Sequence, residues 1–167
     1  MVNRITNLFA EGKVVYTDGG VLAEFAWVLV VLPFVAALII TFIGKSLPMK
    51  GAEVALGTIG IIFVYSVALM FLHITEGIAN EFFINVGSIG QFDIEFGWVV
   101  DGLSIMMYFV VGLVALLVFI YATNYMEGEI RYTFFFTSLT LFAGSMLVLV
   151  SSPTLIQILI GWELVGV

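Results

Sequence analysis

The chain has 167 residues, of which 62% are hydrophobic and only 10% are charged, and its formal net charge is −7. Soluble domains are about half apolar and about a quarter charged, so this composition excludes an ordinary soluble domain and indicates a membrane protein. The absence of cysteine excludes disulfides, thiolate metal sites and a cysteine nucleophile. The five basic residues are spread over the whole length and do not form the positive patch that nucleic-acid binding requires.

The first part of the chain predicts a polar arm followed by two membrane spans. Residues 1–21 contain no apolar core of the length that a signal peptide requires, so we expect an N-terminal arm. Apolar runs over about 24–44 and about 52–75 each have roughly the ~20 residues that a helix needs to cross ~30 Å of hydrocarbon. Pro33 falls inside the first run, where neighbouring helices can satisfy the carbonyl group that it leaves free.

Between the second and third apolar runs, the sequence predicts an extramembrane β-hairpin over about 81–96. Phe92, Ile94 and Phe96 alternate with acidic residues, and this period of two is typical of a half-buried strand. A turn at 87–90 that contains glycine and serine separates this strand from a preceding β-prone run. An irregular loop is the alternative interpretation.

The remainder of the chain predicts three more helices. Spans are expected over about 98–121 and 132–150, and Pro153 starts a last helix over 154–167, because proline is well tolerated in a first helical turn. At ~14 residues this helix is too short to cross the bilayer, so we expect the chain to be a fragment of a longer protein. The predicted fold class is an all-α, polytopic transmembrane helix bundle, with a short β-hairpin between the second and third helices and a membrane domain over 22–167.

Basic residues in the short loops predict the orientation of the bundle, since cytoplasmic loops carry an excess of lysine and arginine. Lys45 and Lys50 follow the first span and Arg131 precedes the fourth, whereas the hairpin segment carries acids and no basic residue. We therefore expect the hairpin and the N-terminus outside. The 45–50 and 124–131 turns are expected on the cytoplasmic side or its organellar equivalent.

Glu163 is the candidate for ion transport, because an acid at membrane depth is costly unless function or pairing offsets the cost. It lies ten residues past Pro153, roughly 15 Å along a helix that rises ~1.5 Å per residue, which predicts a position near the bilayer midplane. Desolvation favours its neutral form, and a lysine from another helix would favour its charged form. A carboxyl group balanced between these states can take up and release a proton. The alternative is a permanently protonated glutamate that hydrogen-bonds a neighbouring helix.

Polar residues near the outer helix ends are secondary candidates. Asp101, Ser104 and Tyr108 fall on one face of the third span, and an acid in the first turn also complements the helix dipole. A helix cap with an interhelix hydrogen bond is the plainer interpretation of these three. His73, near the outer end of the second span, is interpreted as an interfacial packing residue, with a place in a proton relay as the alternative.

The fourth span carries a stripe of small and hydroxyl residues that includes Thr137, Thr140 and Gly144. Such stripes usually join helices, and this one could also line a water path. The sequence contains nothing that resembles a phosphate loop, a nucleophile elbow or a metal site. We expect no cofactor and no metal ion in this chain.

Several motifs follow one another in the second half of the chain. They are Val100-Asp101-Gly102-Leu103-Ser104, Tyr125-Met126, Phe134-Phe135, Ser145-Met146-Leu147 and Gly161-Trp162-Glu163-Leu164-Val165-Gly166. In order and spacing they resemble the antiporter-like L (chain 5) subunit of proton-pumping NADH:quinone oxidoreductase, respiratory complex I, and its relatives, which include the large subunit of Mrp-type sodium/proton antiporters. The resemblance covers about 100–167, and residues 1–99 match only in layout.

The resemblance implies a proton-translocating subunit of a respiratory oxidoreductase, in which Glu163 matches the membrane-centre glutamate of the fifth helix and pairs with a lysine on a later, broken helix. It implies that NADH, flavin, iron–sulfur clusters and quinone are held by partner subunits. The implied partners are the other membrane and peripheral subunits and the lipid bilayer, in a bacterial plasma membrane or an organellar inner membrane.

Two other interpretations stay open at this point. The chain could belong to a Mrp-type sodium/proton antiporter or a related ion-pumping complex, although the motif at 161–166 favours the oxidoreductase, because antiporter relatives more often have hydroxyl residues after the Glu-Leu pair. A helical scaffold without a transport role is the third interpretation. A scaffold would tolerate Glu163→Gln without loss of function.

Overall fold

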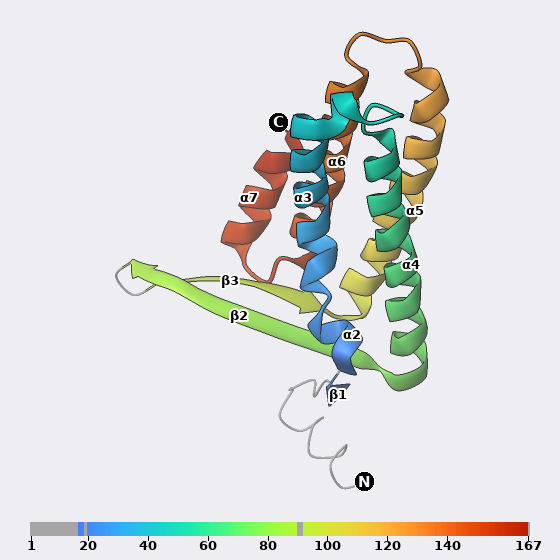
Figure 1. Cartoon of the computed structure of the whole chain (residues 1–167). Helices are drawn as coiled ribbons and strands as arrows, with labels where there is room; N and C mark the ends of the chain where they lie inside the picture. The colour runs from blue at the N-terminus through green and yellow to red at the C-terminus, as the bar shows by residue number, and fades with distance from the viewer. Residues whose placement is uncertain (1–16, 19, 90–91, 167) are drawn as a thin grey trace, which may run out of the picture.

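The computed structural model describes residues 17–18, 20–89 and 92–166, so most of the predicted N-terminal arm and the tip of the hairpin lie outside the described residues. The predicted fold class is confirmed: a helical bundle with a hairpin between its second and third long helices (Figure 1). In chain order the elements are β1 (Thr17–Asp18), α2 (Gly20–Glu24), α3 (Trp27–Ile43), the 3₁₀ turn η1 (Gly44–Ser46), α4 (Ala52–Glu76), β2 (Ile78–Ile89), β3 (Phe92–Val100), α5 (Gly102–Tyr125), α6 (Tyr132–Ser151) and α7 (Leu155–Gly166).

Within the described residues, four helical segments are long and apolar enough to cross a membrane, namely α3 continued by η1, α4, α5 and α6. They stand side by side in Figure 1, and the shorter α7 packs against α6. Their outer surfaces are apolar, with Phe42 82% exposed and Phe71 67% exposed. A bilayer requires an apolar exterior along helices of this length, because lipid replaces water as the solvent of these faces.

Small residues set the distances between the helices. Helix α4 packs mainly on α5, and α3 packs mainly on α6. A Cβ atom at Gly112 would come within 3.2 Å of Phe63 Cα, and one at Gly144 within 3.1 Å of Pro33 Cβ. Glycine therefore permits both contacts, since small residues let the main chains of membrane helices approach closely.

Among the described residues, the Thr137 and Thr140 hydroxyls of the α6 stripe bond within their own helix and not to a neighbouring one. Thr137 Oγ1 donates to the carbonyl of Thr133 at 3.0 Å, and Thr140 Oγ1 donates to the carbonyl of Phe136 at 2.7 Å. Both threonines are buried. Each hydroxyl is thus satisfied by its own helix, which lets a polar side chain lie inside the bundle at low cost.

The hairpin lies across one end of the bundle and projects beyond it (Figure 1). Strands β2 and β3 pair antiparallel with an irregularity of register between Asn85 and Gly87, and β1 adds a short parallel pair to the start of β2. Gly87 and Ser88, predicted in the turn, belong to β2 and pair with β3, whereas residues 90 and 91 lie outside the described residues. The third long helix also begins later than the predicted 98, because Trp98 belongs to β3.

Aromatic contacts attach the hairpin to the first long helix. Trp98 of β3 stacks on Phe82 of β2 with ring centroids 4.5 Å apart, and it meets Trp27 of α3 at 6.5 Å. Next to it, a Cβ atom at Gly97 would lie 1.9 Å from the carbonyl oxygen of Phe82. Only glycine fits at that position, so the close pairing of β2 and β3 depends on it.

Enlarging Gly112 should destabilise the bundle. In Gly112→Val the new side chain meets the main chain of α4 at Phe63, and over-packing of this kind costs about 1–3 kcal/mol. Gly57→Val is the matched control, because nothing lies within 4 Å of a Cβ atom at Gly57 and exposed substitutions usually stay within about 0.5 kcal/mol. Thermal unfolding of the intact protein in detergent measures both, and equal midpoints for the two variants would contradict the close α4–α5 contact.

Candidate functional site

Helix α7 carries Glu163, and it contacts the bundle through one narrow face. Gln157 and Gly161 are buried, whereas Leu159 is 61% exposed and Trp162 is 69% exposed. A Cβ atom at Gly161 would lie 3.0 Å from Leu149 Cα of α6. Glycine is therefore required where the two helices touch, and the remaining faces of α7 are not covered by the described residues.

Glu163 is the one charged residue of α7, and its side chain is exposed. In the part of the chain that the structure describes, it makes no hydrogen bond and no ion pair. Leu149, which meets Gly161, lies two residues before the end of α6, so α7 joins the bundle in the half next to the hairpin. The predicted depth of Glu163 in the bilayer stays a prediction.

Gln157 ties the start of α7 to the hairpin. Its Nε2 donates to the carbonyl of Gly97 at 2.8 Å, and its Oε1 accepts from the Gly97 N–H at 2.9 Å. All four groups are buried, and the amide thereby extends the main-chain hydrogen bonding of β3 to α7. Sequence reasoning missed this residue, although an amide in an otherwise apolar helix was a visible signal that a polar partner lay nearby.

Asp101 and Ser104 form the cap that starts α5. Asp101 Oδ1 accepts from the Ser104 N–H at 2.7 Å, and Ser104 Oγ donates to the carbonyl of Val150 on α6 at 3.3 Å. This arrangement is a helix cap with an interhelix hydrogen bond, the plainer of the two interpretations drawn from the sequence. It satisfies a first-turn N–H group that would otherwise have no partner inside the helix.

Tyr108 and Trp98 bring further polar atoms to the same end of the bundle. The Tyr108 side chain is fully buried, and among the described residues the hydroxyl of Tyr108 and Nε1 of Trp98 have no hydrogen-bond partner. A cavity of about 210 Å³ is lined by Trp98, Ser151 and Gln157 together with neighbouring apolar residues. Its volume exceeds the ~30 Å³ that one water molecule occupies.

His73 joins the end of α4 to the hairpin and to α5. Its Nδ1 lies 2.6 Å from the carbonyl oxygen of Ile78. Because that oxygen can only accept, Nδ1 carries the proton. The other ring nitrogen faces Gly102, where a Cβ atom would come within 2.8 Å of Nε2.

The predicted site residues thus fall into separate groups. His73, Asp101, Ser104 and Tyr108 gather where α4, α5 and the hairpin meet, Thr137 and Thr140 lie within the α3–α6 contact, and Glu163 stands apart on α7. No hydrogen bond links Glu163 to the other groups in the described ranges. No cluster of three or more histidine, aspartate or glutamate side chains able to hold a metal ion occurs among the residues that the structure describes.

The fold and the site define a polytopic helical membrane protein with a lone acid on its short fifth bundle helix. The family described as NADH-Ubiquinone oxidoreductase (complex I), chain 5 N-terminus, matches residues 87–136. The chain is 39% identical over 153 residues to NAD(P)H-quinone oxidoreductase chain 5 of Synechocystis sp. (strain ATCC 27184 / PCC 6803 / Kazusa), a match that covers 87% of this chain and 22% of the relative.

Two further relatives agree with this match. Chain 5 of Picosynechococcus sp. (strain ATCC 27264 / PCC 7002 / PR-6) is 37% identical over 87% of this chain and 23% of the relative. Subunit 5 of the NAD(P)H-quinone oxidoreductase of Paulinella chromatophora (organellar chromatophore 1) is 35% identical over 86% of this chain and 22% of the relative. These similarities confirm the resemblance to chain 5 of complex I, and with the four apolar helices they make the chain an integral membrane protein.

The chain spans about a fifth of the length of the curated relatives that it matches. Glu163 lies beyond residues 87–136, which the family match covers. What the whole protein does, and what Glu163 does in it, are therefore matters for a proposal.

Replacing Gln157 by leucine should loosen α7 and the hairpin together. In Gln157→Leu the N–H and carbonyl groups of Gly97 lose their buried partner, and each unsatisfied buried group costs about 1–3 kcal/mol. Amide hydrogen exchange of the intact protein should become faster in β3 and in α7. Leu155→Ala, at an exposed position of the same helix, is the control, and unchanged exchange at β3 in Gln157→Leu would refute the link.

Proposed function

We propose that the intact protein is a proton-translocating membrane subunit of an NAD(P)H:quinone oxidoreductase, which couples electron transfer elsewhere in the complex to proton pumping. The observation that carries the proposal is the position of Glu163. It is the single acid of α7, a helix that the described residues leave mostly uncovered. The names of the relatives support the oxidoreductase rather than an antiporter, since those described above are subunits of NAD(P)H-quinone oxidoreductases.

The position of Glu163 requires a partner that the described residues do not supply. Its helical neighbours Leu159, Ile160 and Leu164 are apolar. A charged carboxyl group that faces lipid costs at least about 2.5 kcal/mol. In the proposal, further helices of the intact protein cover this face of α7. The relatives are much longer than this chain, which is consistent with such a covering segment.

The proposed covering segment brings a lysine to Glu163. With the ammonium group close, the carboxylate is favoured, and with the ammonium group withdrawn, desolvation favours the neutral acid. Movement of the lysine would then make Glu163 bind a proton on its carboxylate oxygen and later release it to the next acceptor. This is a proton-transfer step only, and NAD(P)H oxidation and quinone reduction are proposed to take place in partner subunits.

The contacts of α7 suit a residue that has to keep one position. Gly161 fixes how closely α7 approaches Leu149, and Gln157 fixes the start of the helix on Gly97. Glu163 lies two residues after Gly161 and six residues after Gln157 on the same helix. Catalytic and transport groups need such support, because an error of about 1 Å in placement is enough to lose activity.

Glu163→Gln in the intact complex should reduce proton pumping severalfold while the complex still assembles, because the shape of the side chain is kept and its titration is lost. Membrane potential driven by NAD(P)H in sealed vesicles measures pumping, and the amount of assembled complex is measured in the same preparation. Glu127→Gln, in the exposed turn before α6, is the matched control and should pump normally.

Normal pumping by Glu163→Gln with normal assembly would contradict the proposal. Loss of assembly in equal proportion would assign Glu163 a structural role and contradict it as well. Pumping that depends on sodium ions would move the protein to the antiporter class.

A further inference from the structure

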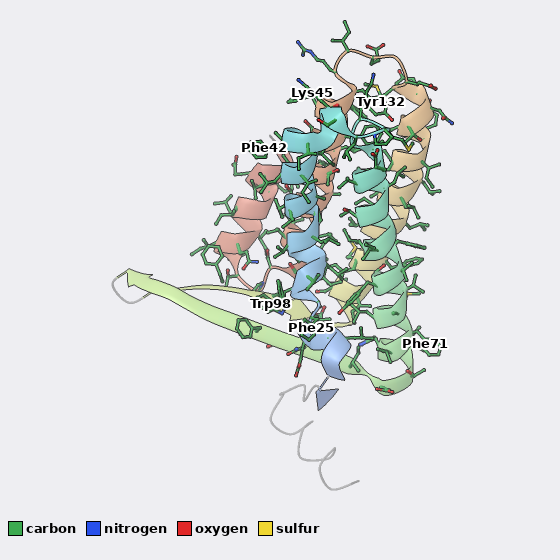
Figure 2. All side chains as sticks on the ribbon, viewed as in Figure 1. Phe25, Phe42, Lys45, Phe71, Trp98 and Tyr132 are labelled. Atoms are coloured by element: carbon green, nitrogen blue, oxygen red, sulfur yellow. The ribbon has the colours of Figure 1, made fainter. Side chains whose placement is uncertain are left out.

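Three of the five basic residues of the chain surround one cavity at the end of the bundle opposite the hairpin. The cavity has a volume of about 690 Å³, and Lys45, Lys50 and Arg131 line it together with Glu129 and the first residues of α6. It is formed where the turn after η1 meets the turn between α5 and α6. Figure 2 shows Lys45 and Tyr132 close to each other at this end, far from Trp98 at the hairpin end.

The two turns pack against each other and have defined main-chain conformations. A Cβ atom at Gly44 would lie 2.8 Å from Cγ2 of Thr133, so η1 packs directly on the first turn of α6. Gly51 and Gly128 have φ angles of +97° and +90°, and Lys50 itself adopts φ +52°. Positive φ favours glycine, so these turns have defined conformations and the cavity is built by the fold.

The basic side chains of the cavity are not held in ion pairs by the described part of the chain, although three acids lie around them. In the described ranges, Lys45, Lys50 and Arg131 form no ion pair. Glu129 is the single acid that lines the cavity. Two other acids lie nearby: Glu53, which accepts a hydrogen bond from the Met49 N–H at 3.1 Å, and Glu127, which lines an adjoining hollow of about 340 Å³ that shares Lys50.

We propose that this cavity binds the phosphate headgroup of an anionic membrane lipid. The Arg131 guanidinium can hold two phosphate oxygens at once, and the two lysines add positive charge around them. Basic pockets between transmembrane helices are suited to anionic lipid headgroups for this reason. The proposal depends neither on proton translocation nor on which side of the membrane this end faces.

The surroundings of the cavity favour a lipid over a soluble phosphate. Phe134, which lines the cavity, is 67% exposed, and Ile130 is fully exposed beside it. Phe42, which is also exposed, lies on the last turn of α3, three residues before Lys45. A lipid whose phosphate is held by the basic residues would have its acyl chains next to these apolar side chains. A free phosphate has no acyl chains and would gain nothing from them.

Binding of phosphatidylglycerol to the intact complex in detergent, measured by native mass spectrometry against phosphatidylcholine, tests the proposal. The wild-type protein should retain phosphatidylglycerol in preference. Lys45→Gln and Arg131→Gln should each weaken binding by about fivefold, as expected for one basic residue near an anionic surface. Glu129→Gln, in the same cavity, should strengthen it, which separates a charge effect from damage to the fold.

Three results would overturn the proposal. Equal retention of the two lipids is one, and equal phosphatidylglycerol retention by the wild type and Arg131→Gln is another. The third is displacement of the lipid by inorganic phosphate at the same concentration, which would mark a site for a soluble anion. If Arg131→Gln does not assemble, Arg131→Lys is measured in its place. This variant keeps the charge and should bind phosphatidylglycerol less tightly than the wild type, because the planar guanidinium is lost.

Discussion

Hydrocarbon offers no hydrogen bonds, so the polar groups of a membrane bundle have to be satisfied by the protein itself. Most of the polar side chains in this bundle obey that constraint locally. Thr140 and Ser151 donate to carbonyl groups of their own helix, and Asp101 caps the helix that it precedes. Gln157 obeys it over a long sequence separation, by pairing with both main-chain groups of Gly97. Among the described residues, the Tyr108 hydroxyl and Nε1 of Trp98 lack a partner, and so does Glu163, which is the charged residue of the three. The proposed function follows from Glu163.

Much of the fold could be predicted from the sequence, because hydropathy and helix length are local properties. The four long helices, the short α7 and the hairpin follow from such properties. The extent of β2 through Gly87 and Ser88 could not be predicted, because it depends on pairing with β3. Gln157 could not be assigned its partner either, since Gly97 lies 60 residues away along the chain. Glu163 was found because charge stands out against an apolar helix, whereas its missing partner cannot be inferred from its neighbours.

The two ends of the bundle have different chemistry. At one end, aromatic contacts of Trp98 and buried hydrogen bonds of Gln157 attach the hairpin to the helices. At the other end, two short turns bring Lys45 and Arg131 to a single cavity. The first end fixes the start of α7 and through it Glu163. In the proposal of a lipid site, the second end holds the bundle at a defined depth in the membrane, which the proposed role of Glu163 inside the bilayer requires.

The proposed function requires that Glu163 is covered by protein in the intact complex and faces neither lipid nor water. A nitroxide-bearing amino acid incorporated at position 163 by stop-codon suppression reports on this position alone, whichever cysteines the rest of the complex contains. Collision of the label with oxygen, which concentrates in lipid, and with a water-soluble nickel chelate can be measured by electron paramagnetic resonance. We expect low accessibility to both reagents. High accessibility to oxygen would place the side chain against lipid, and high accessibility to the nickel chelate would place it in water, and either result would contradict the proposed proton site.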